Sequence, residues 1–234
     1  MNTNQALARL GAVAALLGVV VFFVSGLFHP MGSDPNDLPA AFAEYAASSH
    51  WVAIHLFQFV GVVLVGTALV ALAATFEPGR AAAWARIGLA GAVASVGVYA
   101  ALQAVDGVSN HVMEHRLAAA TGDARALAYE AAFAVRQIEV GLTSFFSLLF
   151  GSTLTVVGLA MVLSTRYPTW LGWVGLLGGL GTVAVGLEQA YHAFSELALN
   201  LFMVVGTVDL IWATLTGILM WRLAPQLVRD SDAA

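Results

Sequence analysis

The sequence predicts an all-α polytopic membrane helix bundle, with six transmembrane helices and a short helical hairpin that extends beyond the membrane on the outer side. The first observation is composition: of 234 residues, 60% are hydrophobic and only 10% are charged, which is far from the average of soluble domains. The second is that long apolar stretches recur along the whole chain. Residues 1–234 are therefore expected to form a single integral membrane domain.

Six segments reach the length of about 20 largely apolar residues that crosses a bilayer core. They are residues 7–28, 52–76, 87–104, 138–163, 171–187 and 201–223. The first is longer than the apolar stretch of about 7 to 15 residues in a signal peptide, so we interpret it as a retained anchor.

The distribution of arginine sets the expected orientation, because cytoplasmic flanks of membrane helices are enriched in positive charge. With both termini in the cytoplasm, most arginines lie on the cytoplasmic side. These are Arg9, Arg80, Arg86, Arg166, Arg222 and Arg229, against Arg116, Arg125 and Arg136 outside. The sequence thus predicts a multi-pass protein of the cell membrane with an acidic outer face.

Two helices are expected to continue past the outer membrane surface. Residues 87–120 contain no helix breaker stronger than Gly107, and a helix over residues 124–163 would be about 60 Å long, against about 30 Å of hydrocarbon. Before them, Asp37 and Pro39 indicate the start of a short helix at the interface.

Several classes of chemistry are excluded. Cysteine is absent, which removes disulfides, thiolate nucleophiles and thiolate metal ligands. Lysine is absent too, so no Schiff base can form. The net charge of -5 gives no basic surface for nucleic acid.

Two short segments carry a resemblance to a known family. They are residues 9–12 (Arg-Leu-Gly-Ala) and 166–175 (Arg-Tyr-Pro-Thr-Trp-Leu-Gly-Trp-Val-Gly). With the six-span length, they resemble an uncharacterised family of small bacterial membrane proteins, a domain of unknown function. The resemblance implies the hydrophobic frame and no activity.

His111, Glu114 and His115 follow the H-x-x-E-H pattern of inverted zinc peptidases. In that pattern, two histidines one helical turn apart bind zinc and the glutamate activates water. Glu114 is thus the candidate catalytic base. The alternative interpretation is a solvated helix whose side chains make ordinary contacts with one another.

Other residues of similar depth can complete a metal site. Glu188 and His192 lie one turn apart near the end of the fifth span, and His55 and Glu139 lie on the second and fourth. The candidate metal ligands are His111, His115, Glu188, His192 and His55, a set that suits zinc or iron.

Three functions compete. The first is a metal-dependent hydrolase acting on a lipid or amphiphile that enters from the bilayer. The second is a haem b protein that exchanges electrons with quinone, with His55 and either His111 or His192 as axial ligands. The third is a proton-coupled transporter or binding protein for a small solute. Each has the bilayer as its partner, and a homo-oligomer is compatible with all three.

Asp209 lies within the sixth span, where a carboxyl group is costly and points to a function. It is either a proton or solute site or a packing residue that faces a hydroxyl such as that of Thr143, Ser144 or Ser147.

Overall fold

The computed structural model describes residues 2–227, and its regular elements are helices. In chain order they are α1 (Thr3–Leu27), α2 (Leu38–Ala47), α3 (Trp51–Ala73), α4 (Arg80–Gln103), the π-helix η1 (Ala104–Asn110), α5 (His111–Ala119), α6 (Asp123–Val162), α7 (Thr169–His192) and α8 (Glu196–Leu223). Six helices are long and apolar enough to cross a membrane, with α4, η1 and α5 forming one of them. The predicted six-span bundle is confirmed.

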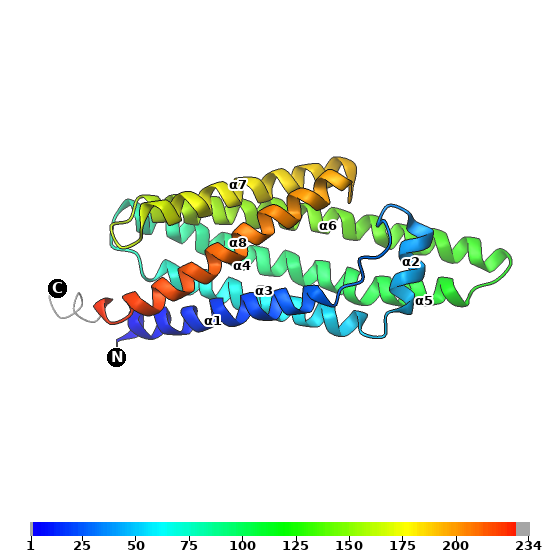
Figure 1. The fold of residues 1–234 in the computed structure, drawn as a ribbon, viewed down its shortest axis with the longest axis horizontal. Coiled ribbons are helices and arrows are strands. Elements are labelled where there is room, and N and C mark those ends of the chain that lie inside the picture. Colours follow the sequence, from blue (N-terminus) through cyan, green and yellow to red (C-terminus); the bar gives the residue numbers. More distant parts are fainter. Residues whose placement is uncertain (1, 228–234) are drawn as a thin grey trace.

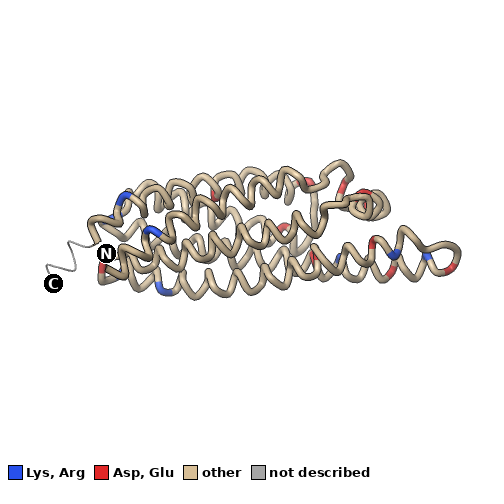
Figure 2. Tube along the Cα trace, turned by 90° about the horizontal axis from the view of Figure 1, so that it is seen from below, with Lys and Arg blue, Asp and Glu red and all other residues tan. Residues whose placement is uncertain are grey.

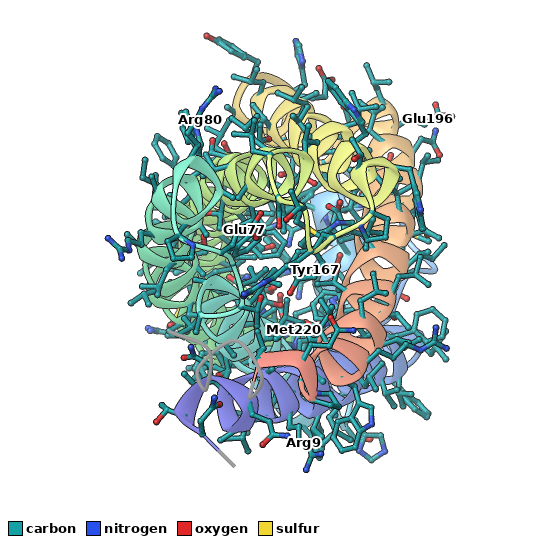
Figure 3. All side chains as sticks on the ribbon, turned by 90° about the vertical axis from the view of Figure 1, so that its left-hand side faces the viewer. Arg9, Glu77, Arg80, Tyr167, Glu196 and Met220 are labelled. Carbon is teal, nitrogen blue, oxygen red and sulfur yellow. The ribbon has the colours of Figure 1, made fainter. Side chains whose placement is uncertain are left out.

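The spans form an elongated bundle, in which the start of α1 and the end of α8 lie at the same end of the molecule (Figure 1). This end is called the end with the termini. Helix α6 packs against α4 on one side and α7 on another, whereas α1 packs against α3 and α8. Viewed from the end that holds the termini, Tyr167 and Met220 point into the bundle, and Arg9 and Arg80 point outward (Figure 3). The apolar core between the spans includes the fully buried side chains of Met220, Leu171 and Trp212.

Glycine allows α6 and α7 to approach until their backbones touch. A Cβ atom at Gly151 of α6 would lie 2.6 Å from the carbonyl oxygen of Gly179 and 2.6 Å from the backbone nitrogen of Val183, both on α7. Small residues at such positions drive helix association in lipid through close van der Waals packing. The glycine-rich sequence of α7 is explained by this contact.

The predicted helical hairpin is confirmed. Helix α6 has 40 residues, and α5 with the first part of α6 projects well beyond the end of α7 (Figure 1). The third span also extends further than residues 87–104, from Arg80 to Ala119. Its helix does not stay regular, however, because it widens into the π-helix around Gly107.

The predicted interfacial helix is α2, which lies across the hairpin (Figure 1). Asp37 caps it by accepting a hydrogen bond from the backbone nitrogen of Ala40 at 3.4 Å, and Pro39 lies in its first turn. Its buried Phe42 packs against Leu117 of α5 and Ala132 of α6. Helix α2 is thus a cap over the base of the hairpin.

Charged residues gather at the two ends of the molecule and leave the middle almost free of them (Figure 2). The arginines expected in the cytoplasm lie near the start of α1, α4 and α7 and the end of α8, toward the end with the termini; they are Arg9, Arg80, Arg86, Arg166 and Arg222. Arg229 is outside the described residues. This distribution suits a bundle that crosses a bilayer.

The contact at Gly151 predicts a large effect of a single methyl group. Gly151→Ala should lower the thermal unfolding midpoint in detergent, with a loss of about 1–3 kcal/mol of stability, because the α7 backbone cannot yield without separating the helices. Gly141→Ala on the same helix is the control, since no atom lies within 4 Å of the added methyl group. Equal midpoints for the two variants would show that this packing contributes little.

Candidate functional site

The end of the bundle opposite the termini holds the buried histidine, carboxyl and guanidinium side chains. Among the described residues, the buried histidine, carboxyl and guanidinium side chains are His55, Glu114, Arg136 and Glu139. They come from α3, α5 and α6, where these helices meet η1 and lie beneath α2. Buried groups of this kind need hydrogen-bond or charge partners.

His55 and Asp106 form a hydrogen-bonded pair. The Nδ1 atom of His55 lies 2.8 Å from the carbonyl oxygen of Trp51, and its Nε2 atom lies 3.1 Å from Oδ2 of Asp106. Because a carbonyl oxygen only accepts, Nδ1 carries a proton. One further proton is then shared between Nε2 and the carboxyl group of Asp106.

The π-helix positions Asp106. Gly107 faces His55 so closely that a Cβ atom there would lie 2.5 Å from the Cβ atom of His55. The carbonyl oxygen of Asp106 also accepts a hydrogen bond from the indole nitrogen of Trp51 at 3.0 Å. Such π-segments are frequent at functional sites.

Aromatic rings bind the segment after α1 to this site. The ring centroid of His29 lies 5.1 Å from that of Trp51 and 5.3 Å from that of His55, and Tyr45 lies 4.6 Å from Trp51. Burial lowers the pKa of His29 and raises the pKa of Tyr45 to about 12. Both side chains are therefore neutral at pH 7 and pack as rings.

Arg136 and Glu139 form a buried ion pair. Nη1 of Arg136 donates to both carboxylate oxygens of Glu139, at 2.6 Å and 2.7 Å. The side-chain amide of Asn110 in η1 also donates to Glu139. The guanidinium group lies over the rings of Tyr45 and Phe194, with its carbon 5.7 Å and 4.6 Å from their centroids. One arginine thus joins α6, α2 and the α7–α8 connection.

Hydrogen bonds hold both ends of the loop before α2 in place. Glu44 accepts hydrogen bonds from the backbone nitrogens of Gly32 at 2.8 Å and Ser33 at 2.7 Å, and the bond from Gly32 lowers the pKa of Glu44. The side chain of Asn36 donates to the carbonyl oxygen of Phe194 at 2.8 Å. The cap is therefore held by backbone and side-chain contacts together.

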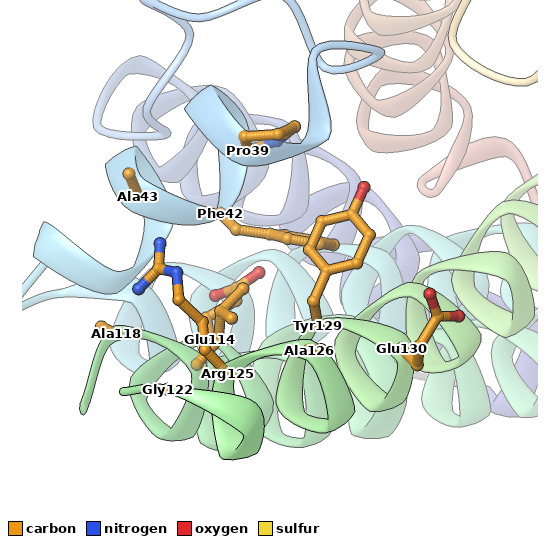
Figure 4. Close-up of a pocket in the computed structure, with 11 residues that line it drawn as sticks. Pro39, Phe42, Ala43, Glu114, Ala118, Gly122, Arg125, Ala126, Tyr129 and Glu130 are labelled. Atoms are coloured by element: carbon orange, nitrogen blue, oxygen red, sulfur yellow. The ribbon is translucent and has the colours of Figure 1, made fainter. Parts of the chain in front are cut away.

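Between α2 and the hairpin lies a pocket of about 600 Å³ (Figure 4). Its lining includes the rings of Phe42 and Tyr129, with Arg125 and Glu130 at the exposed side. Glu114 contributes to the lining although it is only 1% exposed, and neither of its carboxylate oxygens has a hydrogen-bond partner. A carboxyl group without a partner at the base of an aromatic pocket is the most unusual feature of this site.

The structure divides the predicted metal ligands into three places. His55 pairs with Asp106, whereas the rings of His111 and His115 lie 4.4 Å apart at their centroids on α5. On α7, Nδ1 of His192 lies 3.0 Å from Oε2 of Glu188, and the side chain of His192 is 62% exposed. Within residues 2–227, no three histidine, aspartate or glutamate side chains come together as a metal site.

The reason lies in the position of α6. Helix α5 contacts α2, η1 and α6, whereas α7 packs against α6 and α8, so α6 stands between the two histidine pairs. Similar depth in the membrane was expected to bring these residues together, but depth does not fix their position around the bundle. Glu114 shares α5 with His111 and His115, but it lines the pocket and they do not.

Several contributors were missed by the sequence reasoning. Arg136 was interpreted only as an outer charge, and neither Phe42 nor Tyr129 was singled out. A signal existed for Arg136, because it precedes Glu139 by three residues on one helix, a spacing at which opposite charges meet. No local pattern could have shown that Phe42 and Tyr129 share a pocket.

The Arg136–Glu139 pair predicts a strong effect on stability. Arg136→Met should cost about 3–5 kcal/mol, because it leaves the carboxylate of Glu139 buried without its cation. The double variant Arg136→Met/Glu139→Met should recover most of the loss. Thermal unfolding in detergent measures both, with the exposed Arg125→Met as the control; a double variant as unstable as the single one would contradict the assignment.

Comparison with known proteins gives one match. The family described as "Domain of unknown function (DUF4386)" matches residues 49–221, which include the whole hairpin and every span after the first, except the last two residues of α8. No curated protein and no solved structure matches the chain.

Proposed function

The chain belongs to the DUF4386 family, and we propose that it is a membrane protein that binds a small amphiphilic organic cation in the pocket between α2 and the α5–α6 hairpin. The six apolar helices make the chain a multi-pass membrane protein in contact with lipid. The excess of arginine toward the end with the termini supports placing that end in the cytoplasm, and the pocket outside.

The observation that carries the proposal is the carboxyl group of Glu114. Both of its oxygens are buried and lack a hydrogen-bond partner, while the neighbouring Glu139 is fully paired with Arg136 and Asn110. A buried charge without a partner is strongly unfavourable. A ligand that brings N–H donors and a positive charge would satisfy both oxygens at once.

The walls of the pocket support an organic cation over a metal ion. Phe42 and Tyr129 offer ring faces, and their centroids lie 6.1 Å apart in an edge-to-face arrangement. Aromatic faces attract ammonium and guanidinium groups through cation–π interactions. The volume of about 600 Å³ is that of a site for a small organic molecule.

Exposed apolar side chains elsewhere on the hairpin support an amphiphile. Leu127 of α6 is 70% exposed and follows the pocket residues Arg125 and Ala126, and Val112 of α5 is 53% exposed. Side chains of this kind on an extramembrane hairpin are suited to the membrane interface or to the apolar part of a ligand.

The sequence-based alternatives relate to this proposal in different ways. The metal-dependent hydrolase needs His111 and His115 beside Glu188 or His192, and α6 stands between these pairs. The haem b protein needs a free nitrogen on His55, where both ring nitrogens are engaged. A transporter for a small solute remains compatible, since transport begins with binding.

Binding should depend on the charge of Glu114. Phenethylamine is the probe, with phenethyl alcohol and hydrocinnamate as its neutral and anionic counterparts, titrated calorimetrically into protein in zwitterionic nanodiscs. Phenethylamine should bind, and Glu114→Gln should weaken binding roughly ten- to a hundredfold, the value of a hydrogen bond to a charged group. Glu130→Gln at the exposed side is the matched control and should change little.

Two outcomes would overturn the proposal. Equal affinity for phenethyl alcohol would show that charge is not recognised, and equal affinity of Glu114→Gln would place the site elsewhere. Elemental analysis of the same sample tests the metal hypothesis separately. Stoichiometric zinc or iron that is lost in His111→Ala/His115→Ala would favour the metalloenzyme instead.

A further inference from the structure

Asp209 lies at the middle of α8, equally far along the sequence from Glu196 at one end and Arg222 at the other. At 1.5 Å per residue, about 20 Å of helix separates it from each of these charges. Asp209 is half-buried and contacts Thr182 of α7, and no residue of α7 or α8 lines the pocket of Glu114. It therefore represents a second, independent site at the depth of the bilayer centre.

The hydroxyl partner of Asp209 is not the one that the sequence suggested. Thr143, Ser144 and Ser147 lie on α6, whereas α8 packs on α7, and Oδ2 of Asp209 lies 2.6 Å from Oγ1 of Thr182 on α7. Ser144 and Ser147 bond instead to Gly186 and Gln189 of α7. That part of the expectation was wrong, because α7 lies between α6 and α8.

Thr182 has two hydrogen-bond partners, which limits where the protons around Asp209 can lie. Its Oγ1 atom lies 2.6 Å from Asp209 and 3.1 Å from the carbonyl oxygen of Gly178. A hydroxyl group has one proton to donate, and a carbonyl oxygen can only accept. If the hydroxyl donates to Gly178, as threonine commonly does within a helix, the short contact with Asp209 requires a proton on the carboxyl group.

The surroundings offer no charge that would stabilise an ionised Asp209. The helices packed against α8 are α7, α1 and, to a small extent, α3. Their titratable or charged side chains lie toward the helix ends: Arg9 on α1, His55 on α3, and Glu188, Tyr191 and His192 on α7. The Oδ1 atom of Asp209 is buried, has no hydrogen-bond partner and faces Gly178. A carboxylate here would be uncompensated at the centre of the bilayer.

We propose that Asp209 is a proton-binding site at the centre of the membrane, whose carboxyl group is protonated at neutral pH and donates its hydrogen bond to Thr182. The ligand of this site is a proton. Its position between α7 and α8 couples the proton to the packing of these helices, because deprotonation would place a charge against the glycine-lined face of α7. The proposal does not depend on ligand binding at Glu114.

Infrared difference spectroscopy of the protein in nanodiscs at pH 7 tests this site. The spectrum of the unsubstituted protein minus that of Asp209→Asn should contain the carbonyl band of one protonated carboxyl group. Thr182→Val should shift this band, since the hydroxyl acceptor is lost, and Thr182→Ser should leave it in place. Thr155→Val is the control, because Thr155 on α6 bonds only to the backbone of its own helix.

Each result decides the matter. A carboxylate band in place of the protonated one would overturn the proposal, because Asp209 would then be ionised. A protonated band that does not move in Thr182→Val would overturn the hydrogen bond that the proposal rests on. Circular dichroism of each variant shows that the helices are intact, so that loss of the band is not a consequence of unfolding.

Discussion

The hydrogen bonds and ring contacts of the Arg136 guanidinium group are the interaction on which this end of the molecule depends. Removing such a group from water costs several kcal/mol, which only a carboxylate with good geometry and further hydrogen bonds can offset. Glu139 supplies the carboxylate, and the rings of Tyr45 and Phe194 cover the flat faces. Because Tyr45 belongs to α2 and Phe194 to the α7–α8 connection, the same charge also fixes the cap.

Glu139 and Glu114 differ in their hydrogen-bond partners, and the proposed binding site rests on this difference. Both carboxyl groups are buried, and they lie on neighbouring helices. Glu139 has a cation and an amide as partners, so its charge and its hydrogen bonds are satisfied within the chain. Glu114 has neither, and it borders a space large enough for a small molecule. Because Glu139 is paired within the chain and Glu114 is not, Glu114 is the carboxyl group that is available to bind a ligand.

The sequence predicted the fold well because apolar length, arginine placement and helix breakers are local signals. The six spans, the hairpin and the short helix after Asp37 all follow from them. The arrangement of the site was harder to predict from the sequence. Helical spacing indicated that His111 and His115 are neighbours, as are Glu188 and His192, and both pairs exist. Whether two pairs meet depends on the order of helices around the bundle, which no local pattern contains. For the same reason, the sequence could not show that Thr182 is the hydrogen-bond partner of Asp209.

The π-helix has a consequence for how this site could arise and be lost. A π-segment holds one residue more than an α-helix of equal turns, and one residue rotates all that follows by about 100°. The face that α5 turns toward the cap is thus set by the number of residues in η1 as well as by their identity. Loss of a single residue there would point Glu114 away from Phe42 without any change in composition. The geometry of the pocket is therefore more sensitive to insertions and deletions than to most substitutions.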